Sequence, residues 1–230
     1  MKTLGIIGGM GPFATLDFFK KVLGASDVDV DKEHLHILID NYPQIPDRTD
    51  FILGNGENPY PFILESARKL IILNCDIICM PCNTAHYWAE QLKRDIIDDA
   101  IFIDMIETVK DYISQNYGSN KKALILGTNG LVRGEVYDKY FGSSLLMYPE
   151  NSLQDEIMRI IKLIKAGRLK EIVTDFKELL IKLKKYRYDV MIAACTEIPL
   201  ILPFVDSEIS ILDTNLILAN RVVEVAYERI

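Results

Sequence analysis

Asp76–His86 (DIICMPCNTAH) and Asp189–Pro199 (DVMIAACTEIP) are two stretches with one pattern. Each opens on an aspartate, continues as a short apolar run and reaches a cysteine, Cys82 or Cys195, six residues after that aspartate. Two polar residues follow each cysteine. A short apolar run of this kind is typical of a buried strand in a parallel sheet, and open α/β sheets bind ligands at the carboxyl ends of their strands. The pattern therefore predicts one strand-and-thiol unit that the chain builds twice.

The surrounding sequence alternates strand-like and helical segments. Residues 3–7 form an apolar run that stops at glycines, and Pro12 suits the first turn of a following helix. A strand is predicted over 34–40 and a helix over 61–74, and the order restarts with a strand over 122–127. The alternation predicts an α/β fold with mostly parallel sheets, in which two similar, Rossmann-like domains enclose the active site in the cleft between them.

Two helices are expected between the second glycine loop and the second cysteine. The first covers 152–166, with Ser152 as its N-cap and Gly167 as its stop signal, and the second covers 168–186.

The composition narrows the class of protein. The chain has 230 residues, of which 49% are hydrophobic and 26% charged, as in an ordinary globular protein. A net charge of −7 argues against nucleic-acid binding, and no apolar run approaches the ~20 residues of a membrane span. Four cysteines, three of them within residues 75–82, fit a reducing compartment. We therefore expect a cytoplasmic protein without a nucleic-acid or membrane partner.

Four ordered motifs resemble those of the aspartate/glutamate racemase family, and of its aspartate racemases in particular. They are Gly8-Gly9-Met10-Gly11-Pro12 with Ala14-Thr15, Pro43–Thr49, Cys82–His86 and Cys195–Leu200. The resemblance implies a homodimeric amino-acid racemase that uses no cofactor and no metal, and that interconverts L- and D-aspartate. It also implies a last helix that returns to the first half, which gives an N-terminal domain of residues 1–103 plus 212–230 and a C-terminal domain of residues 104–211.

Racemisation requires that a weakly acidic α-proton leave one face of a carbon and that another proton return to the opposite face. Two thiols suit this task, because a reference pKa near 8.5 allows one to act as thiolate base and the other as acid. Cys82 and Cys195 are the predicted catalytic pair, although burial as structural cysteines is the ordinary fate of free thiols. By resemblance to glutamate racemases, Cys82 takes the proton of the D-enantiomer and Cys195 that of the L-enantiomer.

The remaining candidate residues are polar groups near the cysteines and two cations. Asn83, Thr84, Thr196 and Glu197 follow the strands, where they could hold the substrate or simply cap helices. The cations could clamp a distal carboxylate, or be an ordinary surface arginine and a helix-end lysine. The predicted substrate-binding set is Met10, Arg48, Asn83, Thr84, Thr128, Lys165, Thr196 and Glu197, with His86 as a possible accessory residue.

Other functions remain open. Leu131 and Gly134 replace hydroxyl residues of the family pattern and Ala194 replaces a glycine, so the substrate could be glutamate, a hydantoin or another acidic compound. In a different class, Gly9–Ala14 matches G-x-G-x-x-A and could belong to a non-catalytic dinucleotide-binding or amino-acid-binding module. Two features argue against dinucleotide binding. Pro12 has no N–H to donate to the pyrophosphate, and Asp40 lies further along the chain than the acidic residue that binds the ribose in such folds.

Overall fold

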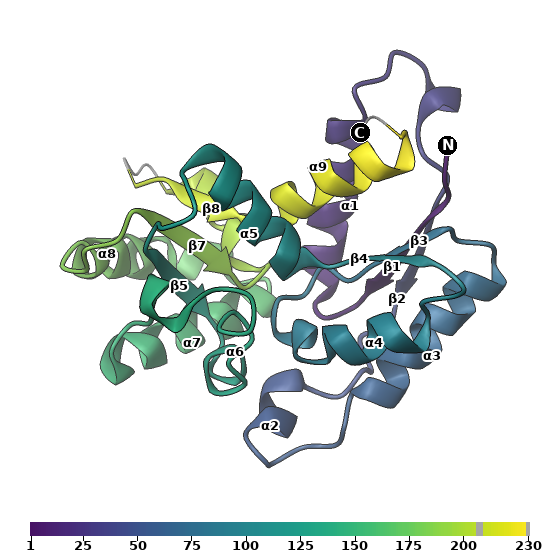
Figure 1. Cartoon of the computed structure of the whole chain (residues 1–230). Helices are drawn as coiled ribbons and strands as arrows, with labels where there is room; N and C mark the ends of the chain where they lie inside the picture. The colour runs from purple at the N-terminus through teal and green to yellow at the C-terminus, as the bar shows by residue number, and fades with distance from the viewer. Residues whose placement is uncertain (206–208, 229–230) are drawn as a thin grey trace.

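The structure, a computed structural model, describes residues 1–205 and 209–228 and contains two parallel sheets (Figure 1). In these ranges each sheet has four strands in the same order, with the first strand of each half between the second and the third, and the fourth at the edge. The strands of the first sheet are β1 (Leu4–Gly8), β2 (Ile37–Asn41), β3 (Ile77–Cys79) and β4 (Ile101–Ile103), and those of the second are β5 (Ala123–Gly127), β6 (Leu146–Met147), β7 (Val190–Ala194) and β8 (Ile211–Asp213). The repeated order confirms the predicted α/β fold of two similar halves.

Helices connect the parallel strands. The α-helices are α1 (Pro12–Ser26), α2 (Arg48–Ile52), α3 (Tyr60–Ile72), α4 (Ala89–Asp95), α5 (Met105–Asn116), α6 (Asn129–Arg133), α7 (Asn151–Lys165), α8 (Val173–Leu183) and α9 (Thr214–Ala226). Short 3-10 turns lie at Asp31–Glu33, Thr84–Trp88, Ser143–Leu145, Leu169–Glu171, Ile198–Leu200 and Leu202–Phe204. None of the helices in the described ranges combines the length and the hydrophobicity that a membrane-spanning segment requires.

Two details of the helix prediction are wrong. Ser152 is not an N-cap, because α7 begins one residue earlier and the Ser152 hydroxyl instead donates to the Glu150 carboxylate. The predicted helix over 168–186 is shorter, since a 3-10 turn precedes α8. The stop at Gly167 is confirmed: its φ of 74° is left-handed, and its N–H donates to the Ile164 carbonyl at 2.9 Å.

The aspartates that open the two repeated stretches fasten each cysteine strand to its own sheet. The Asp76 carboxylate accepts from the Thr3 N–H at 2.7 Å, and the Asp189 carboxylate accepts from the Lys122 N–H at 2.8 Å. In return, the Asp76 N–H donates to the Thr3 carbonyl and the Asp189 N–H donates to the Lys122 carbonyl, both at 2.9 Å. The repeated aspartates therefore fix strand register at the end away from the cysteines.

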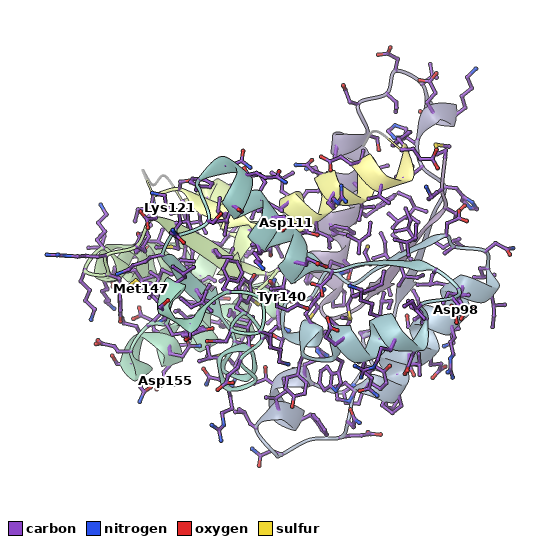
Figure 2. All side chains as sticks on the ribbon, in the orientation of Figure 1. Asp98, Asp111, Lys121, Tyr140, Met147 and Asp155 are labelled. Carbon is purple, nitrogen blue, oxygen red and sulfur yellow. The ribbon has the colours of Figure 1, made fainter. Side chains whose placement is uncertain are left out.

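The apolar core continues between the two halves. Buried residues of α1, α5 and α9 pack in one cluster with inward-facing residues of both sheets, and separate clusters cover the outer face of each sheet. Helix α9 follows the second sheet but lies against α1 and α5 (Figure 1). Figure 2 shows side chains filling this interior, while exposed carboxylates such as Asp98 and Asp155 lie at the periphery. Because the halves share a core, the domain boundaries stay a prediction.

The loop after β1 depends on a glycine. Gly9 has a φ of 89°, and a Cβ there would lie 2.4 Å from the backbone carbon of Tyr42. The Gly9 N–H donates to the Thr15 hydroxyl at 2.9 Å, which joins the loop to α1. The loop can therefore turn tightly against the segment that follows β2 only without a side chain.

We expect Gly9→Ala to lower the free energy of unfolding by more than about 1 kcal/mol, because alanine disfavours a positive φ and its Cβ would clash. Gly24→Ala is the matched control, since this exposed glycine lies inside α1 with no atom within 4 Å of its Cβ position. It should raise the same free energy by about 0.5–1 kcal/mol. Urea unfolding followed by circular dichroism would measure both, and equal effects would contradict the role of Gly9.

Candidate active site

Residues after the strands of both halves line a buried cavity, here called the inner cavity. Its lining consists of Met10, Asp47, Arg48, Thr49, Cys82, Asn83, Thr84, Thr128, Lys165, Cys195, Thr196 and Glu197. Both predicted cysteines and all eight predicted substrate-binding residues are therefore brought together. An adjoining outer cavity shares Asp47, Arg48, Lys165 and Glu197 and is otherwise lined by Gly9, Gly11, Pro12, Phe13, Pro43 and Ile45. The inner cavity has a volume of about 20 Å³ and the outer cavity one of about 290 Å³.

Cys195 follows β7 directly and pairs with an acid two residues later. Its thiol donates to Glu197 Oε2 at 3.0 Å, and Lys165 Nζ lies 3.6 Å from Glu197 Oε1. Burial raises the pKa of the Cys195 thiol well above its ordinary value and Glu197 raises it further, whereas Lys165 lowers it. Cys195 is therefore a protonated thiol in the ligand-free protein.

Lys165 reaches the cavity from the last turn of α7. Burial disfavours its charge, but the negative charge of Glu197 favours it, and the pKa of Lys165 lies above its ordinary value. Lys165 is therefore a stable cation at the boundary between the inner and outer cavities.

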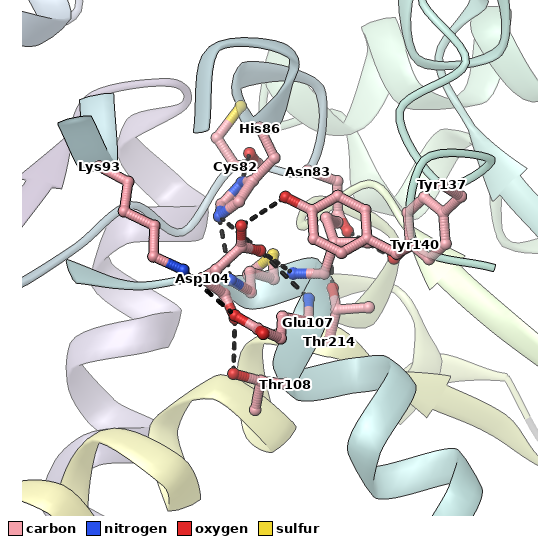
Figure 3. Close-up of polar contacts among 12 residues, drawn as sticks. Cys82, Asn83, His86, Lys93, Asp104, Glu107, Thr108, Tyr137, Tyr140 and Thr214 are labelled. Atoms are coloured by element: carbon pink, nitrogen blue, oxygen red, sulfur yellow. Dashed lines mark hydrogen bonds and ion pairs between the residues drawn. The ribbon is translucent and has the colours of Figure 1, made fainter. Parts of the chain in front are cut away.

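His86 supports Cys82 from outside the cavity (Figure 3). The Met105 N–H donates to His86 Nε2 at 3.0 Å, so this nitrogen carries no proton and Nδ1 is the protonated one. The Nδ1–H then donates to the Cys82 carbonyl at 2.9 Å. Asp104, which caps α5, accepts from the Tyr140 hydroxyl beside this ring. His86 thus fixes the Cys82 backbone rather than lining the substrate space.

Arg48 is buried at the start of α2, with 7% of its surface exposed, and is not the solvated loop arginine considered above. Its Nη1 donates to the carbonyls of Ile45 and Pro46, and its Nη2 donates to the carbonyl of Met10 at 3.4 Å. Nε has no hydrogen-bond partner among the described residues. Three of the five guanidinium N–H groups therefore hold the loops, and the others remain for an anion.

Hydroxyl groups join the two halves across the inner cavity. Thr84 Oγ1 and Thr128 Oγ1 are 2.9 Å apart, and Thr128 also caps the short α6 by accepting from the Leu131 N–H. The Thr196 hydroxyl donates to the carbonyl of Pro81, next to Cys82, at 3.3 Å. A side chain next to Cys195 is therefore bonded to the backbone next to Cys82.

Sequence reasoning missed two lining residues, and two departures from the family pattern lie outside the lining. Asp47 and Thr49 line the inner cavity, and the Asp47 side chain caps α2 by accepting from the Thr49 and Asp50 N–H groups. A Pro-Asp-Arg-Thr sequence could have signalled this N-cap. Leu131 is fully buried, and Gly134 lies against the Tyr87 ring. Because neither lines the cavity, these two departures leave its polar lining unchanged.

Two charged side chains that line the cavity each have one polar atom without a hydrogen-bond partner among the described residues. Among the described residues Glu197 Oε1 lacks a hydrogen-bond partner although Glu197 is 2% exposed, and Arg48 Nε is the matching unpaired donor. Buried polar atoms without partners are costly, so both are suited to a ligand. A ligand with an ammonium group and a carboxylate would satisfy both. Within the described ranges no three His, Cys, Asp or Glu side chains are arranged to hold a metal ion.

Comparison with known proteins gives consistent matches over almost the whole chain. The family model described as Asp/Glu/Hydantoin racemase matches residues 7–222. The broad specificity amino-acid racemase RacX of Bacillus subtilis (strain 168) is 28% identical in an alignment over 228 residues, and 96% of each chain is covered. Picrophilus torridus aspartate racemase superposes with a TM-score of 0.85 at 29% identity, covering 99% of this chain and 95% of that one. An aspartate racemase homologue from Pyrococcus horikoshii OT3 shares the fold, with a TM-score of 0.75, 24% identity and coverage of 99% and 100%.

The contacts of Cys195 predict opposite effects of two substitutions on its reactivity. Glu197→Gln removes a negative charge that raises the pKa of Cys195, so more thiolate should form at a given pH and alkylation should accelerate by about tenfold. Lys165→Met removes a charge that lowers the same pKa, so alkylation should slow.

Peptide mass spectrometry after iodoacetamide treatment at several pH values would measure both rates. Glu150→Gln is the control, because this exposed carboxylate pairs with Lys185. If Glu197→Gln slowed alkylation of Cys195, the electrostatic assignment would be wrong.

Proposed function

The chain belongs to the Asp/Glu/Hydantoin racemase family, and from this premise we propose that it is a cofactor-independent aspartate racemase with Cys82 and Cys195 as its two bases. Family membership makes the protein an amino-acid racemase rather than a non-catalytic binding module. The observation that carries the finer proposal is the inner cavity, where both thiols occur with an acceptor for an ammonium and a donor for a carboxylate that have no hydrogen-bond partner among the described residues.

The two cysteines supply both proton transfers. One cysteine, as a thiolate, removes the α-proton of the bound amino acid, and the other, as a thiol, donates a proton to the opposite face. The substrate therefore does not have to change its orientation in the site. The electron pair left on the carbon delocalises into the α-carboxylate, whose growing charge the remaining N–H of the Asn83 amide stabilises. Each turnover leaves the thiol and thiolate exchanged. Protein side chains alone complete the reaction.

The polar groups define how aspartate is oriented. Glu197 Oε1 accepts from the substrate ammonium, and the free Arg48 N–H groups with Lys165 bind the side-chain carboxylate. These two cations lie at the boundary with the outer cavity, so the distal carboxylate points outward while the α-carbon stays with the thiols. The local positive charge offsets the net charge of −7, which by itself would repel a dianion.

The two thiols differ in their neighbours. Cys195 has Glu197 two residues later, but the residue at that position after Cys82 is Thr84, whose hydroxyl is bound to Thr128. Because Cys195 is protonated, it is the proton donor in the direction in which Cys82 takes the proton of D-aspartate. Isotope washout from each enantiomer in single-cysteine variants would contradict this assignment if the preferences were reversed.

Four free cysteines in the described structure suit a reducing compartment, and we propose a cytoplasmic location. We also propose a homodimer, which light scattering coupled to size-exclusion chromatography would test.

Cys82→Ala and Cys195→Ala should each lower racemisation of aspartate by at least about 10²–10⁴-fold, because each removes one proton-transfer group. Proton NMR in D₂O would follow loss of the α-proton signal, and chiral chromatography would identify the product. Cys75→Ala is the control, since this buried cysteine does not line the cavity. Full activity of Cys82→Ala or of Cys195→Ala, with circular dichroism confirming the fold, would contradict the two-base mechanism.

Substrate choice should depend on the two cations. Lys165→Met should lower kcat/KM for aspartate relative to alanine by about tenfold or more, because it removes a charged partner of the distal carboxylate. Lys162→Met is the matched control, one turn earlier on α7 and outside the cavity lining. A panel including glutamate, hydantoins and neutral amino acids would decide between aspartate and the broad range that the name of the Bacillus subtilis relative indicates. Equal rates for aspartate and alanine in the wild type would overturn aspartate specificity.

A further inference from the structure

A chain of buried hydrogen bonds holds Asn83 from outside the inner cavity (Figure 3). The Tyr137 hydroxyl donates to Asn83 Oδ1 at 2.7 Å, and Asn83 Nδ2 donates to Thr214 Oγ1 at 3.0 Å. We propose that Tyr137 and Thr214 are positioning residues that fix the Asn83 amide so that it presents an N–H to the substrate carboxylate. This inference rests on the racemase function proposed above.

The direction of the chain follows from its last member. Thr214 Oγ1 donates to the Ala193 carbonyl at 3.0 Å, and a carbonyl can only accept. Because the single hydroxyl hydrogen is used there, Thr214 must accept from Asn83, which assigns the nitrogen of the amide to that side. The amide oxygen then accepts from Tyr137, whose pKa burial raises well above its ordinary value, so that its hydroxyl stays a donor.

This orientation matters because little water can replace a lost partner. Tyr137 and Thr214 are fully buried and Asn83 is 1% exposed. Asn83 has two N–H donors, of which Thr214 takes one, so the other is what the amide can offer to the cavity that it lines. A rotated amide would present oxygen lone pairs and repel a carboxylate.

The chain also connects the two catalytic segments. Asn83 follows Cys82, whereas Ala193 lies in β7 two residues before Cys195. Tyr137 belongs to the second half of the chain, 54 residues from Asn83, and Thr214 begins α9, 131 residues away. The same bonds that orient the amide therefore hold the segment carrying Cys82 against the strand that precedes Cys195.

Steady-state racemisation of both aspartate enantiomers would test the proposal in Tyr137→Phe, Thr214→Val and Thr214→Ser. We expect kcat/KM to fall about ten- to hundred-fold in the first two, with most of the loss in kcat, because the weakened contact is with the α-carboxylate, whose charge grows in the transition state. Thr214→Ser keeps the hydroxyl and should stay within about twofold of the wild type. The double variant should lose less than the product of the single losses, since both act through one amide.

Tyr148→Phe is the matched control, because this partly buried hydroxyl donates to Asp138 at 2.6 Å outside the chain described here. The positioning role is wrong if Tyr137→Phe and Thr214→Val racemise aspartate at the same rate as Tyr148→Phe when the folded fractions are equal. The proposed enzyme function would still stand. If Tyr137→Phe does not fold, the kcat/KM values of Thr214→Val and Thr214→Ser decide the question, and equal values would contradict the positioning role. Absence of racemisation by the wild-type protein would overturn the proposed function and this inference together.

Discussion

Burial of polar groups between the two halves is the constraint on which the site depends. Asn83, Thr196 and Glu197 are almost completely inaccessible to water, so each polar atom must find a partner in the protein or be left for a ligand. Most partners come from the other half of the chain, as in the Thr84–Thr128 bond. The atoms that remain unpaired are therefore informative, because the fold accepts their cost only where something else can bind.

The duplicated architecture explains how two thiols from distant sequence positions reach one cavity. Two sheets with the same strand order place the ends of β3 and β7 at equivalent points, and matching aspartates fasten those strands to β1 and β5. The duplication is not complete, since the acid at Glu197 has a threonine counterpart at Thr84. A symmetric scaffold thus carries two thiols with chemically unequal neighbours.

Local sequence was sufficient for the parts of the fold that depend on neighbouring residues. The apolar runs ending at cysteines, Pro12 at the start of α1 and Gly167 after α7 all predicted elements that the structure contains. Local pattern failed at Ser152, because the N-cap of α7 is Glu150, two residues earlier than the capping preference suggests. It also could not tell that the departures at Leu131 and Gly134 fall outside the cavity lining, because burial and packing against Tyr87 are not encoded in a short motif.

The sequence by itself determined the repeated strand-and-thiol units, the alternation of strands and helices, and the identity of the residues with useful chemistry, since all of these follow from periodicity and residue type. Tertiary structure alone decided which groups meet: Lys165 with Glu197, His86 with the Cys82 carbonyl, and Tyr137 and Thr214 with Asn83. It also decided that Arg48 Nε and Glu197 Oε1 lack hydrogen-bond partners among the described residues. Several of these contacts join residues far apart in the chain, and their geometry depends on how helices and sheets pack, which no local pattern specifies.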